Sequence, residues 1–245
     1  MNLSGKIAIV TGAGQGMGRG IAEKLAKEGA SVFVTGRTFS KVEETAELIN
    51  RQGFKAVPGQ ADISNLDDIK RMFDECEKQL GQADILIANA GIAPQISIKD
   101  VTPEMFEQAF NTNARGTLFC LKEAGARLKD EGSIVCVSSS SVSYPVPGMC
   151  VYSSSKAAIH IMAEVAAQEF SERKIQVNVV QPGLTITPAF EGTLPEVFMN
   201  AMIEKTAMKR LGMPEDIAGA VALLCSDDAR WINGQIILVN GGCFG

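Results

Sequence analysis

Short apolar runs alternate with longer amphipathic segments along this chain. Runs of five or six mostly apolar residues, bounded by glycine, proline or polar residues, predict buried strands. They occupy residues 6–11, 31–35, 54–58, 83–87, 133–137, 175–180 and 235–239. Segments with a helical period predict helices between these strands, over residues 16–28, 66–79, 103–129, 152–170 and 214–225, with a further helix ending at Arg51.

Strands that are apolar along their whole length, and that alternate with helices, are typical of a parallel sheet covered on both faces. The connections between such strands are right-handed. We therefore expect an α/β fold, a doubly wound, Rossmann-like parallel sheet of about seven strands that binds ligands beyond the carboxyl ends of its strands. No Pro/Ser/Gly-rich linker divides the 245 residues, so we expect residues 1–245 to form one domain.

Composition narrows the class of protein. The net charge of −5 and the pI near 5.1 argue against a nucleic-acid partner, which calls for a basic patch. The amino-terminal residues lack the pattern of a signal peptide, and no apolar run approaches 18 residues, so we expect a cytoplasmic protein without a membrane partner. The chain has six scattered cysteines and a single histidine, His160, which form no recognisable metal motif. We therefore expect no metal, and cysteines that are reduced thiols. We expect His160 to be a packing residue.

The first strand–helix junction reads Thr11-Gly12-Ala13-Gly14-Gln15-Gly16-Met17-Gly18. Glycines there allow a tight turn and close approach to a pyrophosphate, while the next helix presents free N–H groups. A glycine-rich loop alone also serves any tight turn. Its place after the first strand favours dinucleotide binding.

A second motif pairs Tyr152 with Lys156, four residues later on a predicted helix. That spacing places both side chains on one helical face. Because an adjacent ammonium favours the phenolate, we expect Lys156 to lower the pKa of Tyr152 toward the range that acid–base chemistry requires. Taken alone, such a pair also arises by chance.

Together, these and other motifs resemble the short-chain dehydrogenase/reductase family over essentially the full length of the chain. The motifs follow the family's order: the Thr11–Gly18 loop, Ala88-Asn89-Ala90-Gly91, Asn113, Ser139 standing 13 residues before Tyr152, Tyr152 with Lys156, and Pro182-Gly183. Ala88 is a departure, because many members have a second asparagine there. The resemblance implies a nicotinamide cofactor and an alcohol–carbonyl interconversion, as in carbonyl and 3-oxoacyl reductases.

The resemblance also implies the role of each catalytic residue. Tyr152 would be the acid or base, and Lys156 would lower its pKa and bind the nicotinamide ribose. Ser139 would polarise the substrate oxygen, and Asn113 would hold a water in a proton path, although a locally bonded asparagine is the alternative. Strand alternation points Ser138 and Ser139 to opposite faces, and the 13-residue spacing indicates Ser139.

Cofactor choice depends on the end of the second strand, where Gly36 takes the position of an NAD-selecting acid and Arg37 follows. Arginine suits a 2′-phosphate, so we expect NADP(H) in preference to NAD(H), the alternative being a solvated surface arginine. The expected cofactor contacts are Gly12, Gln15, Gly16, Met17, Gly18, Arg37, Asp62, Ile63, Asn89, Ala90, Gly91, Tyr152, Lys156, Pro182, Gly183, Thr185 and Thr187.

Substrate specificity is expected from a lid at about residues 187–211. Apolar side chains in this lid and near Tyr152 suggest a pocket for a moderately hydrophobic ketone or aldehyde. The alternative is that they only close the lid on the core. These residues are Phe190, Leu194, Val197, Phe198, Met199 and Met202 in the lid, with Ile92, Val146, Met149 and Cys150 elsewhere. A 3-oxoacyl-carrier-protein reductase, for which Arg173-Lys174 could supply basic residues at the mouth, and a sugar, polyol or steroid dehydrogenase are alternatives. A non-catalytic NADP(H)-binding sensor or scaffold is another. The resemblance implies a homotetramer, a dimer of dimers.

Overall fold

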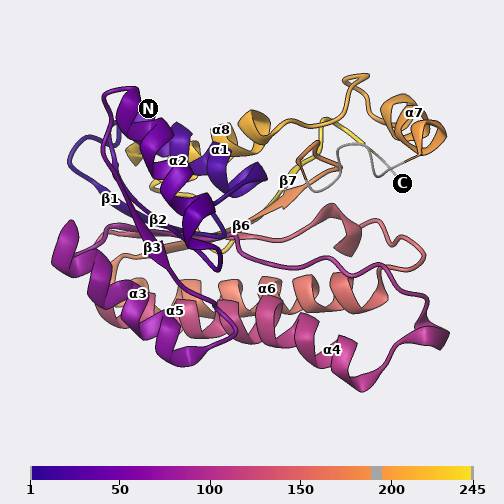
Figure 1. The fold of residues 1–245 in the computed structure, drawn as a ribbon, viewed down its shortest axis with the longest axis horizontal. Helices are drawn as coiled ribbons and strands as arrows, with labels where there is room; N and C mark the ends of the chain where they lie inside the picture. The colour runs from indigo at the N-terminus through magenta and orange to yellow at the C-terminus, as the bar shows by residue number, and fades with distance from the viewer. Residues whose placement is uncertain (1, 189–194, 244–245) are drawn as a thin grey trace.

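A parallel sheet between two layers of helices forms the described part of the chain, residues 2–188 and 195–243 of a computed structural model (Figure 1). The seven strands in these residues are β1 (Ile7–Thr11), β2 (Ser31–Gly36), β3 (Ala56–Gln60), β4 (Ile85–Ala88), β5 (Ser133–Val137), β6 (Gln176–Pro182) and β7 (Ile236–Val239). Their order is β3-β2-β1-β4-β5-β6-β7, so the direction of winding reverses between β1 and β4. The predicted doubly wound sheet is confirmed.

Two helical layers cover the sheet. One face carries α1 (Gly16–Lys27), α2 (Phe39–Arg51) and α8 (Pro214–Leu224), and the other carries α3 (Leu66–Gln79), α5 (Gly116–Arg127) and α6 (Cys150–Glu169) (Figure 1). Alternate residues of each strand enter opposite layers, since successive side chains point to opposite faces. In β1, Ala8 and Val10 join the first core and Ile9 joins the second. This double burial explains why the central strands β1, β4 and β5 are mostly apolar.

The helix predicted over residues 103–129 is interrupted. The structure has α4 (Pro103–Phe110), a π-helical turn (Asn111–Arg115) and then α5. Thr102 begins α4 as expected for its sequence, because its hydroxyl accepts the N–H of Met105 and Pro103 occupies the first turn.

Two other boundaries differ from the prediction. The third strand begins at Ala56 rather than Phe54, which is 36% exposed, and it holds Pro58 because an edge strand can spare an N–H. A helix that the periodicity did not predict, α7 (Glu196–Lys205), lies within the expected lid.

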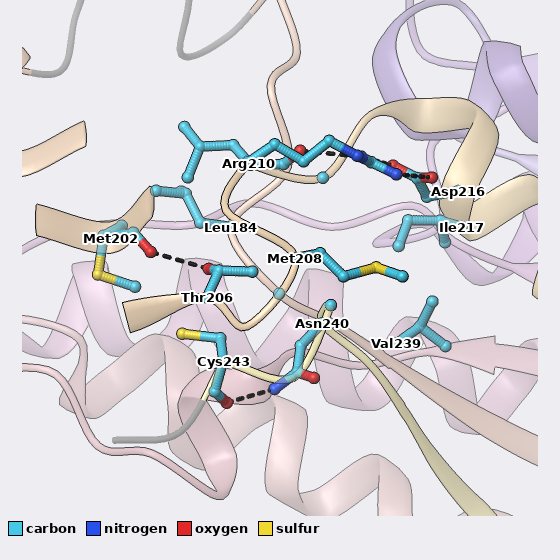
Figure 2. A pocket seen from close by; sticks show the side chains of 14 residues that line it. Leu184, Met202, Thr206, Met208, Arg210, Asp216, Ile217, Val239, Asn240 and Cys243 are labelled. Carbon is cyan, nitrogen blue, oxygen red and sulfur yellow. Dashed lines mark hydrogen bonds and ion pairs between the residues drawn. The ribbon is translucent and has the colours of Figure 1, made fainter. Parts of the chain in front are cut away.

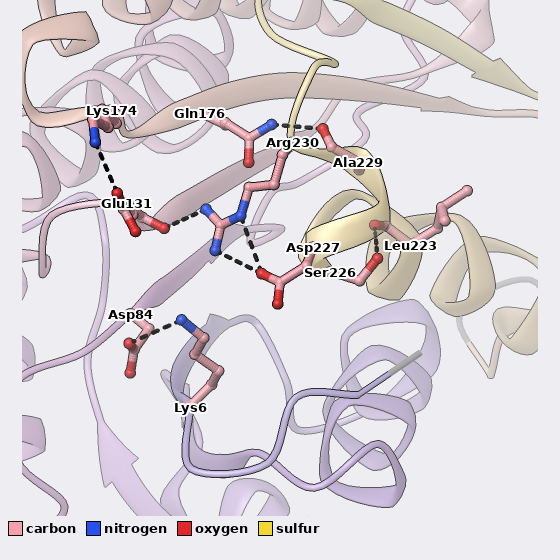
Figure 3. A network of polar contacts seen from close by, with 10 residues as sticks. All are labelled: Lys6, Asp84, Glu131, Lys174, Gln176, Leu223, Ser226, Asp227, Ala229 and Arg230. Carbon is pink, nitrogen blue, oxygen red and sulfur yellow. Dashed lines mark hydrogen bonds and ion pairs between the residues drawn. The ribbon is translucent and has the colours of Figure 1, made fainter.

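Polar side chains join the elements at the amino ends of the central strands (Figure 3). Asp84, which is 6% exposed, accepts the N–H of Ile7 and lies 3.6 Å from Lys6 Nζ and 3.0 Å from Lys129 Nζ. Gln176 of β6 donates to the carbonyl oxygens of Ala229 and Ile232, and so holds the segment that leads to β7. These contacts fix the end of the sheet opposite its ligand-binding edge.

Within residues 2–188 and 195–243, no helix has both the length and the apolar character needed to cross a membrane. All six cysteines lie in this part of the chain and are unpaired.

Candidate active site

The loops after β1 and β4 are joined by a threonine and an asparagine. Thr11 Oγ1 accepts the backbone N–H groups of Asn89 (3.0 Å) and Ala90 (3.1 Å) and donates to the carbonyl oxygen of Ile87. In return, Asn89 Nδ2 donates to the carbonyl oxygens of Thr11 (2.9 Å) and Gly12 (3.3 Å). Both loops are thereby held at the point where the winding of the sheet reverses.

Two glycines of this loop have no room for a side chain. A Cβ on Gly18 would lie 2.2 Å from the carbonyl oxygen of Gly12 and 2.6 Å from Asn89 Nδ2. Gly12 itself has φ +66°, and its Cβ would lie 2.8 Å from Ala90 Cα. The glycines therefore let the β1 loop, the start of α1 and the β4 loop pack together, which leaves N–H groups of α1 open to an anion.

A cleft of about 590 Å³ lies along the carboxyl ends of the strands. It brings together most of the predicted cofactor contacts: Gly12, Gln15, Gly16, Met17, Gly18, Arg37, Asp62, Ile63, Asn89, Ala90, Gly91, Tyr152, Lys156 and Thr187. Pro182, Gly183 and Thr185 are not among its lining residues. The cleft has the elongated set of donors and the glycine cradle that a dinucleotide requires.

One end of the cleft is basic. Arg37 is exposed at the end of β2, and its guanidinium makes no hydrogen bond or ion pair with the described residues; its carbonyl oxygen accepts a bond from Gln60 Nε2. Lys41, in the first turn of α2, also lines the cleft and donates to Gln15 Oε1 at 2.6 Å. An unpaired guanidinium beside an ammonium fits a phosphate group at this end.

Lys41 and Thr38 are cleft residues that the sequence reading did not include. The available signal for Lys41 was a second cation four residues after Arg37, in the first turn of the helix that follows this loop.

Asp62 and Ile63 follow β3, as expected for an adenine site. Asp62 Oδ1 accepts both the N–H and the hydroxyl of Ser64, so half of this carboxylate serves the turn itself. The Asp62 N–H is held by Asp68 Oδ2 at 2.9 Å. Ile63 is 5% exposed and packs against Gly116, whose Cβ would lie 2.6 Å from the Ile63 carbonyl oxygen.

Lys156 is buried at the floor of the cleft. Its Nζ donates to the carbonyl oxygen of Val137 at 2.8 Å and stands close to Gly91, where a Cβ would lie 3.1 Å from it. Burial lowers the pKa of Lys156 to about 8. The group therefore remains mainly charged at neutral pH.

Tyr152 departs from the prediction made from its spacing to Lys156. Burial raises the pKa of the Tyr152 phenol, and a hydrogen bond with Ser139 opposes this rise. The prediction of a lowered pKa was wrong for the protein without a bound cofactor. Removal of the phenol from water raises its pKa by more than the hydrogen bond from Ser139 lowers it. A raised pKa keeps the phenol protonated at neutral pH.

The two serines after β5 have different hydrogen-bond partners, and the predicted catalytic role of Ser139 stays a prediction. Ser138 Oγ lies 2.8 Å from His160 Nε2 and donates to the carbonyl oxygen of Lys156, so its hydroxyl serves α6. Ser139 Oγ contacts Ser141 Oγ, and a hydrogen bond from Ser139 is one cause of the pKa shift of Tyr152. Ser138, but not Ser139, is among the lining residues of the cleft. His160, expected to be a packing residue, also holds Ser138.

Asn113 explains the π-helical turn. Its Oδ1 accepts the N–H of Ile92, and its Nδ2 donates to the Ile92 carbonyl oxygen and to Ser155 Oγ, all at 2.8–2.9 Å. Its own carbonyl oxygen accepts a bond from Thr117 Oγ1. The asparagine is fully buried and joins the β4 loop to α6 rather than bonding only within its own helix. Its predicted role in holding a relay water stays a prediction.

Gly183 and the segment after it border a second, smaller cavity of about 220 Å³ (Figure 2). Figure 2 shows Met202, Met208 and Ile217 around it, with the Arg210–Asp216 ion pair at its rim. Thr185 is 4% exposed and donates to the Gly183 carbonyl oxygen, so its hydroxyl is used within the loop.

The expected lid is only partly described. Phe190 and Leu194 lie outside the described residues, while Val197 is 82% exposed and Met202 lines the second cavity. Of the other substrate candidates, Ile92 lines the cleft.

Three comparisons relate the chain to known proteins. The profile of a family described as "Enoyl-(Acyl carrier protein) reductase" matches residues 12–243. A versicolorin reductase of Emericella nidulans is 37% identical over 255 residues, covering 99% of this chain and 97% of that protein.

Solved structures are similar over the whole chain. A short chain dehydrogenase from Burkholderia cenocepacia in complex with NADP has a TM-score of 0.93 and 31% identity, with 99% of both chains covered. The angucycline C-6 ketoreductase LanV with bound NADP has a TM-score of 0.92 and 35% identity, covering 99% of this chain and 96% of that one.

Proposed function

This chain belongs to the short-chain dehydrogenase/reductase family, and on that premise we propose that it is an NADP(H)-dependent oxidoreductase that interconverts a ketone, or an aldehyde, and an alcohol. The observation that carries the proposal is that Tyr152 and Lys156 both line the cleft that holds most of the predicted cofactor contacts, with Ser139 among the groups that influence the pKa of the Tyr152 phenol.

Two observations support NADP(H) as the cofactor. Similar structures hold NADP, and in this chain Arg37 and Lys41 border the cleft where a 2′-phosphate would lie. Gly36 has no carboxylate that would repel this phosphate.

The nicotinamide, when bound, supplies a hydride to the carbonyl carbon or removes one from the alcohol carbon. During reduction, the protonated Tyr152 gives its proton to the carbonyl oxygen, and its raised pKa suits this task of an acid. The Lys156 ammonium stabilises the phenolate that remains and can bond the ribose of the cofactor. Ser139 donates a hydrogen bond to the same oxygen as charge develops on it.

A ketone is the favoured substrate class, since one similar structure is a ketoreductase. An acyl group on a carrier protein is less favoured. Arg173 and Lys174, the basic residues considered for docking, lie before β6 at the opposite end of the sheet, where they pair with Asp130 and Glu131.

A screen of ketones and aldehydes with NADPH and NADH in parallel tests the proposal. We expect oxidation of NADPH with at least one carbonyl compound, and the loss of at least 100-fold in kcat in Tyr152→Phe. Phe retains the ring, so unchanged NADPH binding by this variant would localise the loss to the hydroxyl. Tight NADPH binding without turnover across the panel would instead favour a non-catalytic sensor or scaffold. The alcohol product then gives the stereochemistry.

We also propose that the protein forms a homotetramer. Leu118 on α5 and Ile161 and Val165 on α6 are apolar and 45–63% exposed, and Trp231, which precedes β7, is 97% exposed. Such side chains support association of copies through these elements.

A further inference from the structure

Two further serines stand behind Ser139 in a chain of hydroxyl groups. Ser139 Oγ lies 3.0 Å from Ser141 Oγ, and Ser141 Oγ accepts a 2.9 Å hydrogen bond from Ser153. Ser141 is 8% exposed, and Ser153 directly follows Tyr152 on α6. The chain of hydroxyls therefore begins on the helix that carries Tyr152 and ends at Ser139, whose hydrogen bond influences the pKa of Tyr152.

The backbone holds Ser139 in place for this contact. Ser139 is extended, with φ −157° and ψ 144°, and begins the short 3₁₀ helix Ser140–Val142. That helix turns Ser141 back, so its N–H also donates to Ser139 Oγ, at 3.2 Å. On the other side, Gln181 Nε2 donates to the Ser139 carbonyl oxygen at 3.2 Å.

The three hydroxyl groups can donate their protons in one order, from Ser153 to Ser141 to Ser139. A hydroxyl has one proton and two lone pairs. Because Ser153 donates to Ser141, the proton of Ser141 is available for Ser139 Oγ. Either hydroxyl can donate in the contact between Ser139 and Ser141. When Ser141 donates, Ser139 Oγ accepts this proton as well as the N–H of Ser141, so both of its lone pairs are used and only its own proton is left to donate.

We propose that Ser141 and Ser153 are positioning residues, which direct the single proton of Ser139 at the phenol oxygen of Tyr152 and, once a substrate is bound, at the substrate oxygen instead. The substrate part rests on the proposed function. The contact with Tyr152 does not, because it exists without turnover. When the Ser141 hydroxyl is absent, Ser139 Oγ keeps one free lone pair and can rotate among staggered positions, so the bond to Tyr152 weakens.

Nuclear magnetic resonance tests the contact without any reaction. The chain has two tyrosines, Tyr144 and Tyr152, so labelling with ¹³Cζ-tyrosine gives two signals, which Tyr144→Phe assigns. In Ser139→Ala, where the bond from Ser139 is lost, we expect the chemical shift of the Tyr152 ¹³Cζ signal to change. We expect Ser141→Ala and Ser153→Ala to move this signal in the same direction, and Ser141→Thr, which retains the hydroxyl, to restore it.

Neighbouring serines provide matched controls. The hydroxyls of Ser140, in the same loop, and of Ser154, which is exposed on α6, make no hydrogen bond within the described residues. Ser140→Ala and Ser154→Ala should leave the Tyr152 signal unchanged. The other titratable groups near this site are Lys156, one turn along α6, and Cys136 of β5, which lies near it, and none of the variants alters them.

Kinetics with an active ketone form the second readout. Ser141→Ala is expected to lower kcat about three- to tenfold, the effect of one net hydrogen bond, with the KM for NADPH unchanged. If Ser153 acts through Ser141, then Ser153→Ala has no further effect in a Ser141→Ala background.

The outcomes separate the two proposals. A Tyr152 signal that stays at its wild-type position in both Ser141→Ala and Ser153→Ala overturns the positioning role, whatever the activity. Additive losses of kcat overturn the single chain of hydroxyls. If the signal moves as expected while wild-type protein reduces no carbonyl compound, the positioning role stands and the proposed function fails.

Discussion

Lys156 Nζ on α6 is bonded at 2.8 Å to the carbonyl oxygen of Val137, the last residue of β5. The bond anchors a fully buried ammonium between a strand and a helix. No carboxylate is among the causes of the pKa shift of Lys156, which burial lowers to about 8. Because burial lowers the pKa of Lys156, the free energy of unfolding depends on pH.

Lys156→Met should change how stability depends on pH. Folding lowers the pKa of Lys156 from 10.5 to about 8, so the unfolded chain binds more protons between these values, and the contribution of this site to stability rises with pH across that window. Methionine abolishes this rise. We expect the free energy of unfolding of wild type, relative to the variant, to increase by up to about 3 kcal/mol from pH 8 to 10.5.

Urea unfolding of both proteins at pH 7.5 and pH 10 measures this difference. Lys99→Met, at an exposed position, is the control and should show no such trend. A difference between wild type and Lys156→Met that is the same at both pH values would contradict the prediction.

Arg37→Asp should change the choice of cofactor. A carboxylate at this position repels a 2′-phosphate and can accept bonds from ribose hydroxyls, so the KM for NADPH should rise at least tenfold more than that for NADH. Lys41→Ala should act in the same direction but less strongly.

Arg51→Asp is the matched control for Arg37→Asp, because Arg51 is exposed at the far end of α2, the helix that follows Arg37, where it pairs with Glu47. Steady-state kinetics with both cofactors decide the matter. Equal changes in the two Michaelis constants would show that Arg37 is only a solvated surface arginine.

Gly18→Ala should destabilise the protein and weaken NADPH binding. The new methyl group would have to displace the Gly12 carbonyl oxygen, at a cost of about 1–3 kcal/mol, which lowers Tm by roughly 2 to 12 °C in a chain of this length. Differential scanning calorimetry measures this change.

Gly219→Ala on α8 offers the opposite case. No atom lies within 4 Å of its would-be Cβ, and alanine is the better helix former, so this variant should gain about 0.5–1 kcal/mol. The same effect on Tm in both variants would contradict the prediction that crowding around the Gly18 Cβ position destabilises Gly18→Ala.

Ile161→Lys tests the proposed tetramer. The side chain is 63% exposed in a single chain, so lysine should leave the fold intact but place a charge in an apolar contact between copies. Light scattering after size exclusion should show smaller assemblies than wild type. Lys122→Ala, on α5, is a milder change that should leave the mass unaltered. An unchanged mass in Ile161→Lys would place the contact elsewhere.

The order of strands and helices could be predicted from the sequence because the central strands β1, β4 and β5 are mostly apolar and buried on both faces. The same holds for the loop at Gly12–Gly18, whose glycines have a local cause. Boundaries that depend on distant partners could not be predicted. The π turn at Asn113 exists because its side chain bonds Ile92 and Ser155, 21 and 42 residues away.

The pKa of Tyr152 shows the same limit. The spacing to Lys156 is visible in the sequence, but the burial of the phenol is a property of the packed chain and has the opposite effect. Likewise, only the folded loop brings the hydroxyls of Ser139, Ser141 and Ser153 into one line.

The parallel direction of the strands has a practical consequence for attaching the protein to a solid support. Every strand presents its carboxyl end to the cleft edge, so the turn around Gly53, which precedes β3, faces away from it, and no atom lies within 4 Å of a would-be Cβ there. A tag inserted at Gly53 would leave Tyr152 open to the bulk solution. Coupling through thiols would do the reverse, because the exposed Cys150 begins the helix that carries Tyr152.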